Sequence, residues 1–128
     1  MKYLWDTNTV IYYLQRQFPE SSEKFIDETL KESMPSFSVI TEIELLCWKT
    51  AKKKDIKVLQ EFISKSHVFG LEKDVKLKTV EIRKKHKIKL PDAIIAATAI
   101  VQESVFLTRN VKDFKGIEEL RLLNPHEK

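Results

Sequence analysis

The segment KLPDAIIAATAI, residues 89–100, limits the folds open to this chain more than any other feature. Pro91 suits the first turn of a helix, where its missing N–H is no loss, and the residues after Asp92 are apolar almost all round. A helix of this composition must be covered by protein on most of its sides. We therefore expect an enclosed helix over residues 91–102, with Asp92 at its open end.

Short apolar runs rich in β-forming residues alternate with segments of helical period along the rest of the chain. The runs are KYLW, FSVI, HVFG, SVFLT and LRLL. The other predicted helices cover residues 9–17, 22–31, 41–51, 55–64 and 74–86. This alternation is typical of βαβ units. The sequence therefore predicts an α/β fold, a three-layer α/β/α sandwich with a mostly parallel central sheet of four to five strands.

Length and composition favour one soluble domain over residues 1–128 and exclude several other classes of protein. The chain has 128 residues, 42% of them hydrophobic and 33% charged, which is ordinary for a globular protein. Its single cysteine excludes an internal disulfide framework, and no Cys or His cluster has zinc-finger spacing. No apolar run approaches the ~20 residues of a membrane span, so we expect a cytoplasmic protein. The net charge of +4 is compatible with a polyanionic partner but does not require one.

Carboxylates follow several of the predicted strands at the point where each strand ends. Asp6 follows KYLW, Glu42 and Glu44 follow FSVI, and Asp113 follows VFLT, while Asp92 opens the enclosed helix. In open parallel sheets these ends line the ligand crevice. Two carboxylates ~4 Å apart repel by roughly 4 kcal/mol at an effective dielectric near 20, so a crowded set needs protons or a cation. Ligation of Mg²⁺ or Mn²⁺ by carboxylate oxygens is the more natural solution.

Each of these residues also has a purely structural interpretation. Asp6 could cap the helix that follows it, and Thr41-x-x-Glu44 fits a capping box. Asp92 could be a first-turn acid that the helix dipole favours, and Asp113 a surface charge. Elsewhere, Asp55 is expected as an N-cap, Cys47 as a small buried residue, His126 as a surface residue and the tail NPHEK as frayed.

Four pieces of the chain together carry a resemblance to a known family. They are LWDTNTVIYYL, SVITEIELL, LPDAIIAATAI and FLTRNVKDFKGIEELRLLNP, in this order. The chain resembles the PIN-domain ribonucleases, and specifically the VapC-like toxins of type II toxin–antitoxin pairs. It departs from the family pattern at Cys47 and Trp48, where relatives often have Tyr-Gly, and after the enclosed helix, where they often have Gly.

The resemblance implies a metal-dependent endoribonuclease that leaves 5′-phosphate and 3′-hydroxyl ends. The implied catalytic and metal-binding acids are Asp6, Glu44, Asp92 and Asp113, with Mg²⁺ as the cofactor and Mn²⁺ as its substitute. The implied supporting polar residues are Asn8, Thr108 and Asn110. Glu44 matches the family's Glu-Leu pair better than Glu42, which points ~200° away on a helix. Asn110 stands where many relatives carry the last acid, so either it or Asp113 fills the fourth position.

The same resemblance implies an RNA substrate, a cognate antitoxin that blocks the crevice, and a homodimer. Phosphates of RNA need cations outside the acidic centre, and a basic run leads directly to Asp92. This run contains Arg83, Lys84, Lys85, Lys87 and Lys89. Its structural alternative is a solvated face with lysines that favour a helix C-terminus.

Two other classes of function remain open at the level of sequence. One is a catalytically silent PIN-like module that binds RNA or protein. The other is a receiver-like or phosphatase-like domain, which would carry a second acid beside Asp6, whereas DTN supplies one.

Overall fold

The computed structural model describes residues 1–49 and 52–128, and it has the predicted α/β architecture. Seven α-helices are described: α1 (Thr7–Leu14), α2 (Glu20–Glu32), α3 (Val39–Leu46), α4 (Lys53–Ser64), α5 (Lys73–Lys85), α6 (Leu90–Val101) and α7 (Val111–Phe114). The strands are β1 (Tyr3–Trp5), β2 (Ser36–Ser38), β3 (His67–Phe69), β4 (Val105–Leu107) and β5 (Leu122–Leu123). A 3-10 helix, η1 (Pro125–Glu127), follows β5. Each of the five apolar runs therefore overlaps a strand.

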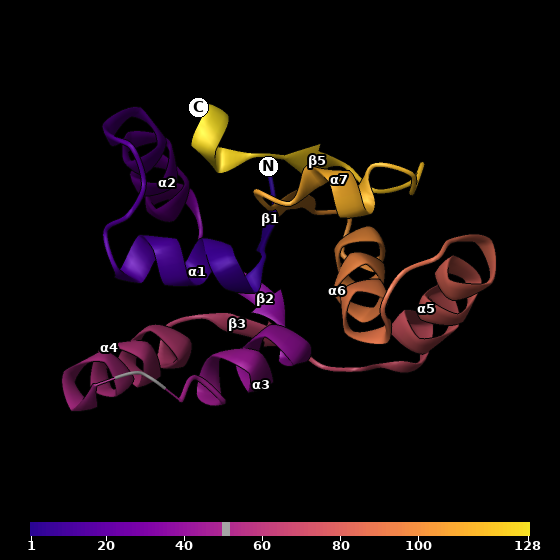
Figure 1. Cartoon of the computed structure of the whole chain (residues 1–128), viewed down its shortest axis with the longest axis horizontal. Coiled ribbons are helices and arrows are strands. Elements are labelled where there is room, and N and C mark those ends of the chain that lie inside the picture. Colours follow the sequence, from indigo (N-terminus) through magenta and orange to yellow (C-terminus); the bar gives the residue numbers. More distant parts are fainter. Residues whose placement is uncertain (50–51) are drawn as a thin grey trace.

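The central sheet is parallel throughout and has two hydrogen-bonded parts. One part has the strand order β1-β4-β5 and the other consists of β2 and β3. β1 lies against β2, so the two parts adjoin in the middle of the molecule (Figure 1). The pairing of Trp5 with Leu107 brings the carboxyl ends of β1 and β4 to the same edge. This edge is where the sequence predicts the acids.

Successive side chains along each strand point to opposite faces of the sheet, and this divides the hydrophobic core into two clusters. Leu4 and Phe106 belong to one buried cluster, which also contains the apolar residues of α6. Trp5 and Leu107 belong to a second cluster, which also contains Val10 of α1. Helices α5 and α6 lie on one side of the sheet and α1, α2 and α4 on the other, while α3 contacts both α1 and α6 (Figure 1). A period of two in the strands thus produces the predicted three layers.

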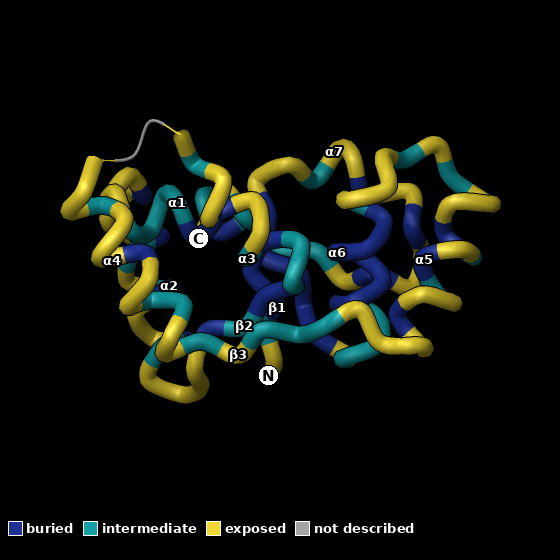
Figure 2. The backbone as a smooth tube through the Cα atoms, turned by 90° about the horizontal axis from the view of Figure 1, so that it is seen from below, coloured by how far each residue is buried: buried dark blue, intermediate teal, exposed yellow. Residues whose placement is uncertain are grey.

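Helix α6 is enclosed as its composition predicts. Every residue from Ala93 to Ala99 is buried, and Figure 2 shows the helix dark along most of its length. It packs against α5, and it also contacts β2, β4 and α3. The hydroxyl of Thr98 would be costly to bury without a partner, and it donates to the carbonyl of Ile94 at 2.8 Å. The predicted start at Pro91 is one residue late.

Two helix starts differ from the prediction because side-chain caps override the apolar pattern. Ser38 caps α3 by accepting a hydrogen bond from the backbone N–H of Ile40 at 3.1 Å, so Val39 and Ile40 are helical rather than extended. The predicted Thr41-x-x-Glu44 capping box is therefore wrong, since Thr41 lies inside the helix. Asp55 lies at the third position of α4 rather than at its N-cap, and it accepts from the N–H of Lys52.

The end of α3 and the C-terminal tail also differ from expectation. α3 ends at Leu46, well before the predicted residue 51, which lies outside the described residues together with residue 50. Cys47 is exposed rather than buried. The tail forms η1 instead of fraying, and His126 packs against Tyr12 and Phe18 with ring centroids 4.8 and 4.7 Å apart. Within residues 1–49 and 52–128, no helix is long and apolar enough to cross a membrane.

Candidate active site

Asp6 is fixed at the end of β1 by hydrogen bonds to both of its carboxylate oxygens. Its Oδ1 accepts from the backbone N–H of Thr7 at 2.8 Å, which makes it the N-cap of α1. Its Oδ2 accepts from the hydroxyl of Thr108 at 2.8 Å. The backbone N–H of Asp6 donates to the carbonyl of Leu107 at 3.0 Å, which joins the ends of β1 and β4. Asp6 can therefore cap α1 through Oδ1 while its Oδ2 faces the other residues of the site.

Glu44 reaches the same edge from α3, which contacts α1. The hydroxyl of Thr7 donates to its Oε1 at 2.6 Å, and the hydroxyl oxygens of Thr7 and Thr41 lie 3.1 Å apart. Thr7 thus holds two acids: its backbone N–H donates to Asp6, and its side-chain hydroxyl donates to Glu44. The choice of Glu44 over Glu42 agrees with this contact.

Asp92 and Asp113 approach from the other side of the edge. Asp92 lies in the first turn of α6, is half-buried, and accepts no hydrogen bond from the described part of the chain. Asp113 lies in the short helix α7, is exposed, and accepts a hydrogen bond from the side-chain amide of Asn110 at 2.5 Å. The N–H of Asn110 donates to the hydroxyl of Thr108 at 3.0 Å. Thr108 thereby connects the Asp6 side to the Asp113 side.

The pKa directions indicate that the four carboxylates lie close enough to interact. Burial raises the pKa of Asp6, against the lowering effect of its two hydrogen bonds, and the charges of Asp92 and Glu44 raise it further. Burial also raises the pKa of Asp92, and the charges of Glu44 and Asp113 add to this, while Lys89 opposes them. The four acids therefore form one electrostatically coupled group, which a bound cation would stabilise.

Two clefts open on this acidic group. The first, of about 330 Å³, is lined by Asp92 and Asp113 together with Lys87, Ile88, Lys89 and Lys112; we call it the lysine cleft. The second, of about 220 Å³, is lined by Asp6, Asn8, Tyr12, Arg109 and Asn110; we call it the arginine cleft. Each cleft thus combines at least one acid of the group with basic side chains.

The structure also shows which predicted residues lie elsewhere and which neighbours the sequence missed. Arg83, Lys84 and Lys85 are in the last turn of α5 and line neither cleft. Thr7, Thr41, Tyr12, Arg109 and Lys112 were not predicted as site residues. Thr7 lies between two predicted residues in DTN and could have been found as a helix-start hydroxyl. Lys112 had no signal, because α7 itself was not predicted.

Comparison with protein families gives a match over nearly the whole chain: the PIN domain family matches residues 3–120. The chain belongs to the PIN domain family. PIN domains are generally nucleases, which agrees with acids gathered at a strand edge. The match favours neither a receiver nor a phosphatase. Comparison with curated proteins found no match.

Solved structures similar to this PIN domain come from toxin–antitoxin complexes. A chain of VapBC2 from Rickettsia felis bound to a DNA fragment from its promoter is 26% identical, with a TM-score of 0.82 over 97% of this chain and 98% of that one. A chain of a toxin–antitoxin complex from Klebsiella pneumoniae is 28% identical, with a TM-score of 0.75 over 97% and 98%. A chain of DNA-bound VapBC from Salmonella typhimurium is 26% identical, with a TM-score of 0.80 over 98% of both chains.

Proposed function

We propose that this PIN domain is a metal-dependent endoribonuclease and the toxin of a toxin–antitoxin pair. The observation that carries the proposal is the coupled acidic group, which brings Asp6, Glu44 and Asp92 together from segments far apart in the sequence. The charges of Asp92 and Glu44 raise the pKa of Asp6, and the charge of Glu44 raises the pKa of Asp92, so grouping these acids costs free energy in the absence of a cation. A structural role for each acid separately does not explain why they are grouped.

The donor set fits Mg²⁺ or Mn²⁺. All its ligand atoms are carboxylate, amide or hydroxyl oxygens, and Asp92 has both carboxylate oxygens free of hydrogen bonds from the described residues. Within those residues, no three acids, histidines or cysteines already surround one point as a metal cage. Mg²⁺ characteristically takes one or two carboxylates and completes its shell with waters and substrate phosphate oxygens. Asp6 and Asp92 are the principal ligands in this proposal.

The proposed reaction is hydrolysis of an RNA phosphodiester bond. A bound divalent ion would polarise a non-bridging phosphate oxygen and favour ionisation of water. The water oxygen bonds to phosphorus, the bond from phosphorus to the 3′ oxygen breaks, and that oxygen takes a proton, which leaves 5′-phosphate and 3′-hydroxyl ends. Glu44 and Asp113 orient the attacking water.

The supporting residues act by fixing the acids in this proposal. The hydroxyl of Thr108 donates to Asp6 and favours its ionised form, and the side-chain amide of Asn110 donates to Asp113. Asn8 lines the arginine cleft beside Asp6, where its side chain can contact the substrate.

The proposed partners are a cognate antitoxin and a second copy of the chain, in the cytoplasm. The similar structures are toxin–antitoxin complexes, which supports an antitoxin. Apolar side chains that are exposed on α3 and α5 support the proposal that a protein partner covers these helices. Ile43 is 50% exposed, Leu46 58%, Leu77 62% and Val80 51%.

The test is cleavage of end-labelled RNA by the purified chain with Mg²⁺, with Mn²⁺ and with chelator. We expect chelator-sensitive cutting that Asp6→Asn and Asp92→Asn abolish, whereas Glu42→Gln on the other side of α3 retains it. Equal cutting by all of these proteins would identify a contaminating nuclease and refute the site. Binding of RNA without cutting, across several RNA classes, would favour the silent module instead.

A further inference from the structure

The acidic group creates a requirement that the proposed chemistry does not itself meet. A polyanionic RNA strand must approach four carboxylates, and the phosphates on either side of the cleaved bond need cations to offset this repulsion. The sequence offers many candidates, since 23 of the 128 residues are Lys or Arg. The structure reduces them to a few by showing which basic side chains adjoin the acids.

The lysine cleft provides such cations on one side. Lys87 and Lys89 come from the segment between α5 and α6, and Lys112 comes from α7, so separate segments converge on the cleft. All three side chains are exposed. None of them forms an ion pair within the part of the chain that the structure describes, although Asp92 and Asp113 line the same cleft. Their charges are therefore available to a ligand.

The arginine cleft provides a more rigid cation on the other side. The Nη1 of Arg109 donates to the hydroxyl of Tyr12 at 3.1 Å, and its guanidinium carbon lies 5.7 Å from the centre of the Tyr12 ring. Tyr12 is in turn packed against Phe18 and His126. Since a guanidinium has five N–H donors, Arg109 keeps donors for a phosphate while its position is fixed.

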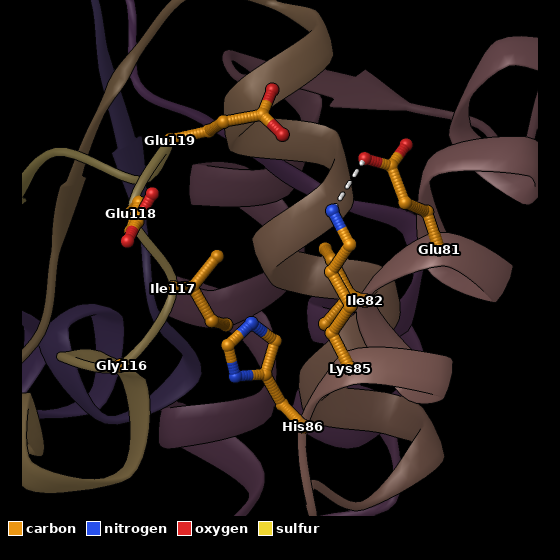
Figure 3. Close-up of a pocket in the computed structure, with 8 residues that line it drawn as sticks. All are labelled: Glu81, Ile82, Lys85, His86, Gly116, Ile117, Glu118 and Glu119. Carbon is orange, nitrogen blue, oxygen red and sulfur yellow. Dashed lines mark ion pairs between the residues drawn. The ribbon is translucent and has the colours of Figure 1, made fainter.

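The rest of the basic run faces a different environment. Lys85 lies 3.7 Å from Glu81, and both line a separate cleft of about 290 Å³ with His86 and the loop after α7 (Figure 3). That cleft also contains Glu118 and Glu119, and it contains none of the four site acids. Its carboxylates would repel a phosphate backbone. Arg83 and Lys84 are exposed in the last turn of α5, where they complement the helix dipole.

We propose that single-stranded RNA crosses the acidic group between these two clefts, with phosphates held by Lys87, Lys89 and Lys112 on one side and by Arg109 on the other. Arg83, Lys84 and Lys85 lie off this path. The inference rests on the proposed function for its substrate class, and it assigns the phosphate-binding residues that the sequence alone could not separate.

The test is the salt dependence of RNA binding, measured by fluorescence anisotropy with a labelled single-stranded oligonucleotide and Mg²⁺. The chain carries Asp6→Asn to prevent cutting, and Lys87→Ala, Lys112→Ala and Arg109→Ala are added one at a time. The logarithm of the binding constant falls as the logarithm of the salt concentration rises, and for single strands each lost phosphate contact makes this slope shallower by about 0.7. We expect that change for each of these three variants. Matched controls on α5, Lys84→Ala and Lys76→Ala, are expected to keep the original slope.

Lys89 lines the same cleft as Lys87 and Lys112, so Lys89→Ala is expected to reduce the steepness of the salt dependence in the same way.

The outcomes separate this inference from the proposed nuclease. If the wild-type chain never cuts RNA but the cleft variants still lower the slope, the path is supported and the nuclease is refuted. If the chain cuts RNA while the cleft variants bind as the parent does, the path is refuted and the nuclease stands. Equal losses from Lys84→Ala and Lys87→Ala would also overturn the path, because they would show that the whole basic run attracts RNA without a defined route.

Discussion

Thr108 holds the centre of the site together, and replacing it by valine isolates that contribution. The side chain is fully buried, and valine has nearly the same shape without the hydroxyl. The variant loses the hydrogen bond to Asp6 Oδ2 at 2.8 Å and the bond from the N–H of Asn110 at 3.0 Å. It does not create a large cavity, so the change in stability reports mainly on these two bonds.

The size of the effect follows from the two bonds. A hydrogen bond to a charged group contributes about 1.5–3 kcal/mol, and the lower half of that range applies because Asp6 is partly exposed. The bond from Asn110 adds about 0.5 kcal/mol, since Asn110 is exposed and water can replace its partner. The sum is about 2–2.75 kcal/mol at neutral pH. With a typical urea m-value of about 2 kcal/mol/M, the unfolding midpoint should fall by about 1 M.

The assay is urea unfolding of the wild type, Thr108→Val and Thr108→Ser without divalent ions, at neutral and acidic pH. Thr108→Ser keeps the hydroxyl and should retain most of the lost stability. Because the hydroxyl favours the ionised form of Asp6, the pKa of Asp6 should rise further in Thr108→Val. Serine and valine variants of equal stability, with Asp6 titrating as in the wild type, would refute this reasoning.

Three further predictions concern single residues. Asp92→Asn should be more stable than the wild type at pH 8 without metal, because the folded pKa of Asp92 is raised and its ionisation weakens the fold as pH rises through that pKa. The advantage of the variant should vanish in acid, below the usual pKa range of an aspartate. A less stable variant in urea unfolding at pH 8 would contradict this. The stability of the wild type should fall as pH falls below about 6.5, because burial lowers the folded pKa of His126 and unfolding lets its ring take up a proton. His126→Phe should remove this loss of stability. Parallel pH–stability curves for the two proteins would count against it. Phe106→Ala should lower the free energy of unfolding by about 3–5 kcal/mol in the same assay, because the ring is fully buried and meets the Phe114 ring edge-on with centroids 5.0 Å apart. A loss below about 1 kcal/mol would contradict this, because it would show that the core can collapse around the smaller residue.

The fold was predictable because its strongest signals are long or repeated. The enclosed helix α6 follows from the almost wholly apolar segment that begins at Ala93 and ends at Val101, and each predicted strand overlaps an observed one. The errors fall where one short-range hydrogen bond outweighs the pattern, as with the Ser38 cap that makes Val39 helical. Periodicity also carries no information about the tail, where the packing of His126 on Tyr12 is a tertiary contact.

The candidate site was predictable at the level of its acids but not of its connections. Strand ends and the family resemblance point to Asp6 and Asp92, and the structure shows them within one coupled group. The link from Thr7 to Glu44 joins residues 37 positions apart, so local spacing could not reveal it. The division of the basic run has the same origin: Lys85 and Lys87 are neighbours in sequence but line different clefts.

The most direct test of the central claim is binding of Mn²⁺, followed by its electron paramagnetic resonance signal. The chain is titrated with and without an RNA whose cleavable phosphates are replaced by phosphorothioates, and compared with Asp6→Asn, Asp92→Asn and Glu42→Gln. The coupled acidic group predicts saturable binding that the two aspartate variants weaken about tenfold or more and that Glu42→Gln leaves intact. Equal affinity in all four proteins, or no binding by the wild type in either condition, would contradict the claim that these acids form a metal site.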